Sequence, residues 1–378
     1  MVAWVPADFY RAVDGGLQCT LCPFRCRLRD GDTGACEVRR RDGDRVLTAT
    51  WSTTVEHWSS VERKPFYHFR PGLPLLTLAP PGCSFRCDYC VNHRVSQYGR
   101  DPDARVTAHT VDVGKLVGSA AERGAGLALS YSEPSLAAEL TLELGARAGP
   151  LGVPLVWKSN GFLTPEAVER VAPVLAAVNI DVKAAGESEH RRLTGASLAP
   201  VLEAARLFRD AGVWVEISTP VIPGTSSDDR QLASIAGFVA SLGADTPWHL
   251  LRFTPTYRMG DHRPTAPERL ASAARVGRAA GLRHIYVERA LGATGRATHC
   301  PGCGVEVVTR GVWGRAESRL RGGSCPACGE RIAGVWDGDA PGDPCAGPRP
   351  EDADASRARA SREEASESPR ASGSEQPT

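Results

Sequence analysis

The chain has 378 residues, which is enough for one large domain with smaller appended modules. Its formal net charge of +1 excludes a bulk electrostatic attraction toward nucleic acid or an acidic surface. No apolar run approaches the ~18 residues that a membrane span needs. The first residues do not resemble a signal peptide, and the cysteines cluster at metal-site spacing rather than as a disulfide framework, so we expect a cytoplasmic protein.

The first cluster of cysteines lies in a module that we place at residues 1–62. Four thiolates at this spacing could close a tetrahedral zinc site or hold an accessory iron–sulfur cluster. The spacing alone does not separate these two sites, and we favour structural zinc. The four candidate ligands are Cys19, Cys22, Cys26 and Cys36.

Between residues 63 and 290, short apolar or β-branched runs alternate with stretches of helical periodicity. This alternation predicts an α/β fold built from parallel βα units. Six such units fall short of the eight in a closed barrel, so a partial barrel and an open doubly wound sheet both fit. The predicted strands are 73–79, 126–131, 153–159, 177–184, 213–219 and 248–253, and the clearest helices are 133–149, 197–212 and 266–281.

The loop after the first of these strands reads "GCSFRCDYC" and contains Cys83, Cys87 and Cys90. Thiolate-only ligation suits zinc or an iron–sulfur cluster, and no fourth cysteine follows nearby. A [4Fe–4S] cluster held by three cysteines keeps one iron open, which is typical of a catalytic site. The alternative is a zinc site whose fourth ligand is a distant histidine.

This C-x3-C-x2-C motif, with Tyr89 before its last cysteine, resembles the signature of the radical S-adenosylmethionine (SAM) superfamily. The resemblance implies that the amino and carboxylate groups of SAM bind the open iron. It further implies cofactor contacts at successive strand ends: Glu133 in "SYSEP" with the methionyl ammonium, Asn160 in "KSNGF" with methionyl or ribose groups, and Asp181 and Lys183 in "NIDVKA" inside the barrel. Lys183 would pair with the SAM carboxylate.

A narrower resemblance covers residues 17 to 336. The cysteine-rich opening, the bridge "KPFYHFRPG" and the SAM motif together resemble the radical SAM enzyme of the AmmeMemoRadiSam system, a relative of the pyruvate formate-lyase-activating enzymes. Phe24 and Val91 stand where that family usually has histidine and glutamine, and neither is a cluster ligand. The resemblance implies a partial (β/α)6 TIM-type barrel, Memo-like and AMMECR-like partner proteins, and an electron donor such as flavodoxin or ferredoxin.

Residues 291–336 contain two Cys-Pro-x-Cys-Gly segments, which are typical of a zinc ribbon. We expect Zn²⁺ to replace a hydrophobic core in a segment this small, and partner or nucleic-acid binding is the alternative role. Residues 337–378, with Cys345, are too polar to fold and are predicted to be disordered. The four ribbon ligands are Cys300, Cys303, Cys325 and Cys328.

The resemblance implies reductive cleavage of SAM to a 5′-deoxyadenosyl radical, followed by hydrogen abstraction from a substrate that the sequence does not identify. The alternatives are a glycyl-radical-enzyme activase and a zinc-dependent binding module with an inactive barrel. His249 and Arg252, at the end of the sixth strand, could face substrate or brace the rim of the barrel. His68 is expected to be structural.

Overall fold

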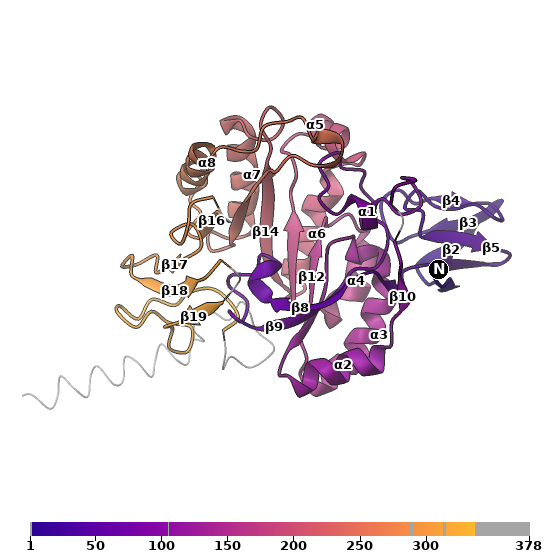
Figure 1. Ribbon diagram of the computed structural model, residues 1–378, viewed down its shortest axis with the longest axis horizontal. Helices are drawn as coiled ribbons and strands as arrows, with labels where there is room; N and C mark the ends of the chain where they lie inside the picture. The colour runs from indigo at the N-terminus through magenta and orange to yellow at the C-terminus, as the bar shows by residue number, and fades with distance from the viewer. Residues whose placement is uncertain (1, 105, 288–289, 313–314, 337–378) are drawn as a thin grey trace, which may run out of the picture. The chain divides into compact units, whose positions relative to one another are not determined.

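The computed structural model describes residues 2–104, 106–287, 290–312 and 315–336 (Figure 1). The segment predicted to be disordered, 337–378, lies outside these residues, together with Cys345. The domain boundaries near residues 62 and 290 remain predictions.

An eight-stranded sheet is the central element of the fold. Seven strands run parallel and stand in chain order, and β8 pairs antiparallel with β9 at one edge. All eight residues of β14 are buried, as expected for a parallel strand covered on both faces. The strands are β8 (Glu56–Ser60), β9 (Pro74–Leu78), β11 (Gly126–Leu129), β12 (Leu155–Ser159), β13 (Ala177–Asp181), β14 (Trp214–Val221), β15 (Trp248–Arg252) and β16 (Ile285–Val287).

The six predicted strands are present as β9, β11, β12, β13, β14 and β15. The count of six parallel strands was wrong, because β16 adds a seventh beside β15. This strand has only three residues, Ile285–Val287, which is too short for a recognisable alternation of polar and apolar residues.

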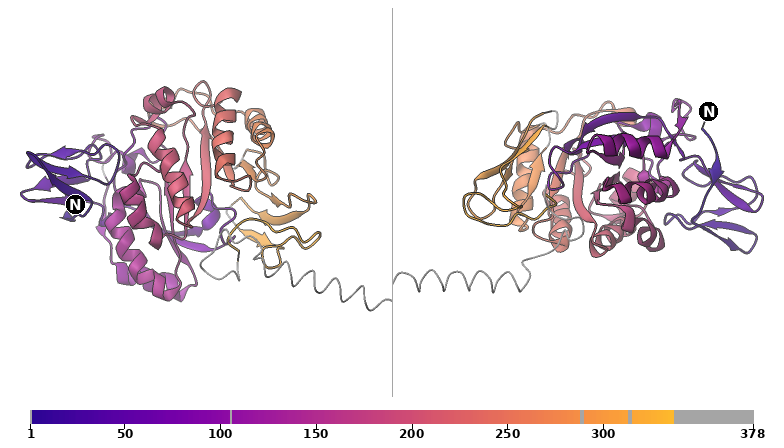
Figure 2. Two further views of the ribbon diagram at one scale, coloured as in Figure 1. Left: turned by 180° about the vertical axis from the view of Figure 1, so that it is seen from behind. Right: turned by 90° about the horizontal axis from the view of Figure 1, so that it is seen from below.

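Helices cover the outer face of the sheet (Figures 1 and 2). Three begin at a side chain that accepts a hydrogen bond from the first helical turn: Asp112, Thr164 and Asp228. The helices are α1 (His93–Ser96), α2 (Val113–Glu122), α3 (Ala138–Ala148), α4 (Pro165–Val171), α5 (Glu187–Thr194), α6 (Ala199–Asp210), α7 (Asp229–Leu242) and α8 (Pro267–Ala279). Short 3-10 turns lie at Val61–Arg63, Pro134–Ala137, Gly149–Leu151, Ala172–Val174 and Tyr257–Met259.

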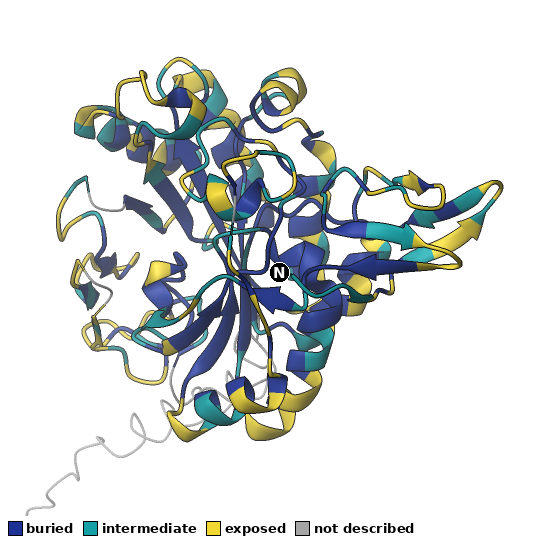
Figure 3. Ribbon diagram, turned by 45° about the vertical axis from the view of Figure 1, so that its right-hand side comes forward, coloured by how far each residue is buried: buried dark blue, intermediate teal, exposed yellow. Residues whose placement is uncertain are grey.

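The N-terminal segment folds into two small antiparallel sheets whose outer tips are exposed (Figure 3). Its buried Arg39 donates to both oxygens of Glu139 on α3, at 2.9 and 3.1 Å. This two-pronged ion pair fixes the segment against the barrel helices. The strands are β1 (Val5–Pro6), β2 (Tyr10–Val13), β3 (Gly16–Cys19), β4 (Arg27–Leu28), β5 (Arg39–Asp42) and β6 (Arg45–Thr48). Beyond them, β7 (Ser52–Thr53) pairs with β10 (His109–Thr110).

The bridge, residues 64–72, closes the inner face of the sheet near the starts of its strands. Phe66 and Phe69 pack there against Ala177 and Trp214, at the starts of β13 and β14. Glu216 of β14 accepts hydrogen bonds from the backbone of the bridge, at 2.8–3.0 Å. Open space on this face is therefore confined to the carboxyl ends of the strands.

The C-terminal cysteines belong to a three-stranded antiparallel sheet of β17 (Thr298–His299), β18 (Glu306–Arg310) and β19 (Ala316–Ser318). The strand-like segment that follows returns to the bridge. Val335 donates to the carbonyl of His68 at 2.8 Å and accepts from the amide of Arg70 at 2.7 Å.

Candidate active site and metal centres

A cavity of about 380 Å³ lies at the carboxyl ends of the parallel strands. The carboxyl ends of six consecutive parallel strands, or the loops that directly follow them, all contribute to its lining. This is the edge at which parallel α/β barrels place their reactive groups. One residue from each segment, in chain order, is Cys83, Glu133, Asn160, Asp181, Pro220 and Arg252.

The three cysteines of the loop after β9 all line this cavity. Cys87 is buried, whereas Cys83 and Cys90 are half-buried. Burial raises the pKa of Cys87 to about 12 and raises that of Cys83 well above its ordinary value. Buried thiolates need a nearby cation, and bound iron would supply it. The donor set and the adjoining space therefore fit a three-cysteine iron–sulfur cluster with one open iron.

Asn160 connects this loop to the next strands. Its Nδ2 donates to Ser84 Oγ at 2.9 Å and lies 3.5 Å from Cys83 Sγ. A neutral amide donor close to a cysteine sulfur can stabilise the negative charge of the thiolate. Asn160 is therefore placed to orient Cys83 as well as to line the cavity.

Glu133 is held in place by three hydrogen bonds. Its Oε1 accepts from Ser159 Oγ at 2.6 Å and from Ser135 N at 3.0 Å, and its Oε2 accepts from Asn160 N at 2.8 Å. Burial nevertheless raises the pKa of Glu133 above its usual range. A cationic ligand group entering the cavity would favour the ionised form of this carboxylate.

Asp181 lies between two lysines on the cavity wall. Lys183 Nζ donates to its Oδ2 at 2.9 Å, and Lys158 Nζ donates to its Oδ1. Although burial opposes ionisation of Asp181, the two lysines outweigh it and lower the pKa. Asp181 likewise raises the pKa of Lys183 against the effect of burial. This part of the wall thus presents two ammonium groups around one carboxylate.

Lys158 was not predicted as a site residue. The available signal was its rarity, since it is one of only four lysines, and its position on the third strand two residues before Asn160. Lys158 also donates to Asn179 Oδ1 at 2.7 Å. Lys158 reaches Asn179 and Asp181 because β12 pairs with β13, which places Lys158 directly opposite Asn179.

His249 and Arg252 have different surroundings. Arg252 lines the cavity and donates through Nε to Thr265 O at 2.9 Å. We expected His249 to lie near the mouth of the barrel. The structure places it in the interior instead. It is fully buried, and its Nε2 lies 2.6 Å from Glu216 Oε2. His68 is also buried, with its ring nitrogens 2.6 Å from Ala333 O and 2.5 Å from Tyr286 OH.

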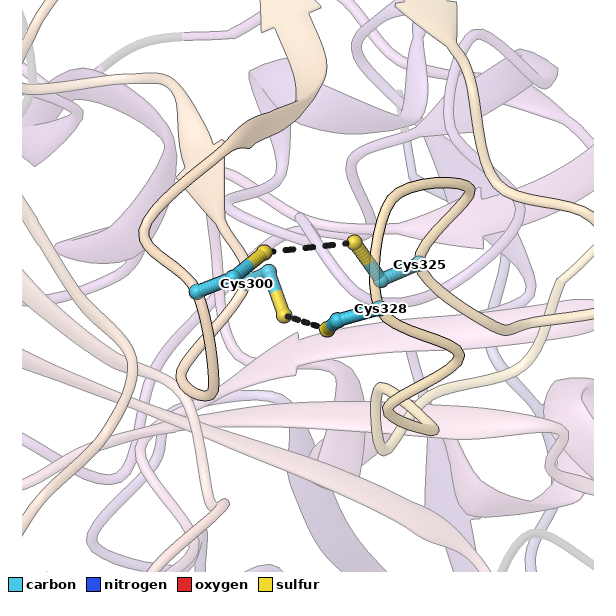
Figure 4. Close-up of side chains that lie close together, drawn as sticks. Cys300, Cys325 and Cys328 are labelled. Atoms are coloured by element: carbon cyan, nitrogen blue, oxygen red, sulfur yellow. Dashed lines mark hydrogen bonds between the residues drawn. The ribbon is translucent and has the colours of Figure 1, made fainter.

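The C-terminal cysteines form a compact four-sulfur group (Figure 4). Their Sγ atoms all lie within 4.8 Å of one another, with Cys300 and Cys328 at 3.5 Å and Cys303 and Cys325 at 3.7 Å. Tetrahedral zinc with Zn–S bonds of about 2.3 Å holds its sulfurs roughly 3.8 Å apart. This group therefore fits a structural zinc ion.

Replacing Cys325 with serine is expected to release about one zinc per chain, because only three of the four thiolate ligands remain. Protection of backbone amides in residues 291–312 and 315–336 should fall at the same time. Zinc content by elemental analysis and hydrogen exchange measure the two effects. Full zinc retention in the variant would contradict the assignment.

The four N-terminal cysteines line a second, small cavity, which Leu136 closes from the turn Pro134–Ala137. Cys19, Cys22 and Cys36 are buried and Cys26 is half-buried. The four thiols therefore face a common space, and the metal that they would hold stays a prediction.

The fold and the three-cysteine cavity define the class of protein, and comparison with known sequences agrees. Residues 78–234 match the model of the radical SAM superfamily, and the chain belongs to that superfamily. It is 31% identical over 333 residues to an uncharacterized protein of Methanocaldococcus jannaschii, a match that covers 86% of this chain and 98% of the relative.

Two named enzymes are more distant relatives. The pyruvate formate-lyase 1-activating enzyme of Escherichia coli K12 is 26% identical, over 51% of this chain and 78% of that enzyme. The isethionate sulfite-lyase activating enzyme of Nitratidesulfovibrio vulgaris is 29% identical, over 35% of this chain and 44% of that enzyme. The chain is thus homologous to activating enzymes. None of the described helices is long and apolar enough to cross a membrane.

Proposed function

We propose that the protein is a radical SAM oxidoreductase that cleaves SAM reductively and abstracts hydrogen from a substrate. The observation that carries this proposal is the placement of Cys83, Cys87 and Cys90 around one cavity at the strand ends. These three residues would hold a [4Fe–4S] cluster. When bound, the cluster and SAM supply a one-electron cleavage that gives methionine and a 5′-deoxyadenosyl radical.

The residues of the cavity wall would bind the amino-acid part of SAM. Lys183 and Lys158 provide positive charge for its carboxylate, while Asp181 and Glu133 provide acceptors for its ammonium. Asn160 orients Cys83 and can also reach methionyl or ribose polar groups. The enclosing apolar side chains Phe85 and Phe253 limit the access of water to this space.

The substrate would reach this site past the ribbon. A neighbouring cavity of about 190 Å³ shares Val91, Asn92 and Tyr131 with the first. Its other side is formed by Arg296 and Val312 of the C-terminal segment. We therefore assign the C-terminal segment a second role beyond zinc binding, as one wall of the substrate entrance.

Within the superfamily, we assign the chain to the AmmeMemoRadiSam type. Support comes from the bridge sequence, whose backbone amides at Tyr67 and His68 are bound by Glu216, and from the cysteine-rich opening that precedes it. Memo-like and AMMECR-like proteins, or their products, are then candidate substrates. All described cysteines are free, which supports a reducing, cytoplasmic location.

A glycyl-radical-enzyme activase is the second candidate function. The observation in its favour is the similarity to two activating enzymes. An inactive barrel with a zinc-binding role is the third candidate, and it predicts protein that contains zinc but no iron.

The test is a product assay under anaerobic conditions. Protein reconstituted with iron and sulfide, reduced with dithionite and supplied with SAM should form methionine and 5′-deoxyadenosine. Adding a Memo-like or AMMECR-like protein should raise 5′-deoxyadenosine formation at least tenfold, and deuterium from the labelled partner should enter the product. A glycyl radical detected by EPR on an added partner would favour the activase instead. Reconstituted protein without SAM cleavage would contradict the proposed function.

A further inference from the structure

The cavity at the substrate entrance has an excess of positive charge in its wall. Its volume is about 190 Å³, and three arginines line it: Arg63, Arg296 and Arg310. Of the described residues in this lining, Glu62 alone carries a carboxylate. Burial raises the pKa of Glu62 to about 7, so this carboxylate is only partly ionised near neutral pH. The wall therefore stays positive at neutral pH.

Arg296 is nearly buried but only partly hydrogen-bonded. The residue is 8% exposed, and its Nε donates to Arg310 O at 3.3 Å. Its two terminal nitrogens have no hydrogen-bond or ion-pair partner among the described residues. A buried guanidinium without partners is costly, whereas paired N–H donors of this kind match the two oxygens of a carboxylate or phosphate. Arg296 is therefore available to an anion in the cavity that it lines.

Arg310 fixes this part of the wall. Its side chain is fully buried, and its Nη1 donates to Arg296 O at 2.9 Å and to Thr298 Oγ1 at 2.8 Å. Its Nη2 donates to Tyr67 O in the bridge. Its Nε has no hydrogen-bond partner among the residues that the structure describes and lies 4.0 Å from Glu62 Oε1. Arg310 thus holds the backbone of Arg296 in place and adds a charge that Glu62 balances only in part.

A further cation lies behind Tyr131, whose side chain lines both the entrance cavity and the SAM cavity. Lys64 is buried, and its Nζ donates to the hydroxyl of Tyr131 at 3.0 Å. Lys64 forms no ion pair with any described carboxylate. Tyr131 has a φ of 70°, which is costly for a bulky side chain and is found most often at ligand sites. The boundary between the two cavities is therefore also positive.

We propose that the substrate carries a carboxylate or phosphate group, and that Arg296 binds this oxyanion in the entrance cavity. That the bound molecule is the substrate rests on the proposed function, whereas binding of the anion does not. Val91, Asn92 and Tyr131 line both cavities, so a molecule held at Arg296 can extend its other end toward the SAM site. The oxyanion would compensate positive charge that the protein leaves without a counter-charge.

Calorimetric titration of oxidised, reconstituted full-length protein tests the anion site in the absence of SAM. Inorganic phosphate and succinate are titrated separately, because a guanidinium binds either kind of oxyanion. At least one of them should show saturable binding, and the tighter of the two identifies the group as phosphate or carboxylate. In Arg296→Gln the affinity should fall about tenfold or more, because the charge-assisted hydrogen bonds are lost.

Arg319→Gln is the matched control, because Arg319 is an exposed arginine of the same C-terminal segment and does not line the cavity. It should bind the anion as tightly as the wild type. Equal affinity in Arg296→Gln and the wild type would overturn the proposal, and so would an equal loss in the two variants. Zinc content and melting temperature show whether Arg296→Gln is folded.

The wild-type titration decides the question even if Arg296→Gln does not fold, since the absence of saturable binding with both anions would overturn the proposal. Failure of the proposed function looks different: the wild type would bind an anion but would form no 5′-deoxyadenosine from SAM. Cleavage of SAM by a wild type that binds neither anion would overturn this inference alone.

Discussion

Replacing Cys87 with alanine is expected to abolish the SAM-responsive EPR signal and to reduce 5′-deoxyadenosine formation to background. Cys87 is the most buried ligand of the SAM motif, and its loss leaves two protein thiolates for a cluster that needs three. The loss should exceed a thousandfold, because the chemistry belongs to the bound cofactors and no side chain can substitute for them. Anaerobic EPR with and without SAM, together with product chromatography, measures both effects.

The zinc content of the Cys87→Ala protein should remain at the wild-type level, since the ribbon lies elsewhere in the chain. The control Cys345→Ala is expected to keep both signal and activity. An unchanged SAM-responsive signal in Cys87→Ala would place the cluster at another set of cysteines.

Replacing Asp181 with asparagine is expected to lower the free energy of unfolding by about 3 kcal/mol. The exposed fractions of the three side chains are 19% for Asp181, 15% for Lys158 and 11% for Lys183, so both ammonium groups would remain charged in a poorly solvated space. Removing one partner of a buried ion pair costs more than the pair contributes, because the remaining charge is uncompensated. Urea unfolding followed by tryptophan fluorescence measures the change.

A surface pair offers a matched control. Asp210 bonds Arg209 but is 60% exposed, so Asp210→Asn should change stability by less than about 1 kcal/mol. The double variant Asp181→Asn/Lys158→Met removes one of the two stranded charges and should recover part of the loss. If the Asp181→Asn variant is as stable as the wild type, the folded protein does not need this carboxylate to compensate the charges of the two lysines.

Much of the site could be predicted because cysteine spacing and strand ends are local features. The three cysteine clusters and the positions of Glu133, Asn160, Asp181 and Lys183 at strand ends all follow from short stretches of sequence. The structure brings these four residues around one cavity. Their contacts with bound SAM stay a prediction.

What could not be predicted depends on contacts between distant segments. Lys158 joins the site only because β12 pairs with β13, and His249 is buried because the bridge brings Tyr67 against it. The metal at the four N-terminal cysteines stays a prediction, since spacing along the chain does not distinguish zinc from an iron–sulfur cluster.

The pairing of the bridge with Val335 has a consequence for how the protein is made. On the ribosome, residues 66–69 emerge more than two hundred residues before their partners at 333–335. Until then Phe66 and Phe69 have only part of their apolar surroundings. Contacts so distant in sequence form slowly, and partly exposed apolar surface favours aggregation. The nascent chain is therefore a candidate client for chaperones that bind apolar segments, until the last strand-like segment docks.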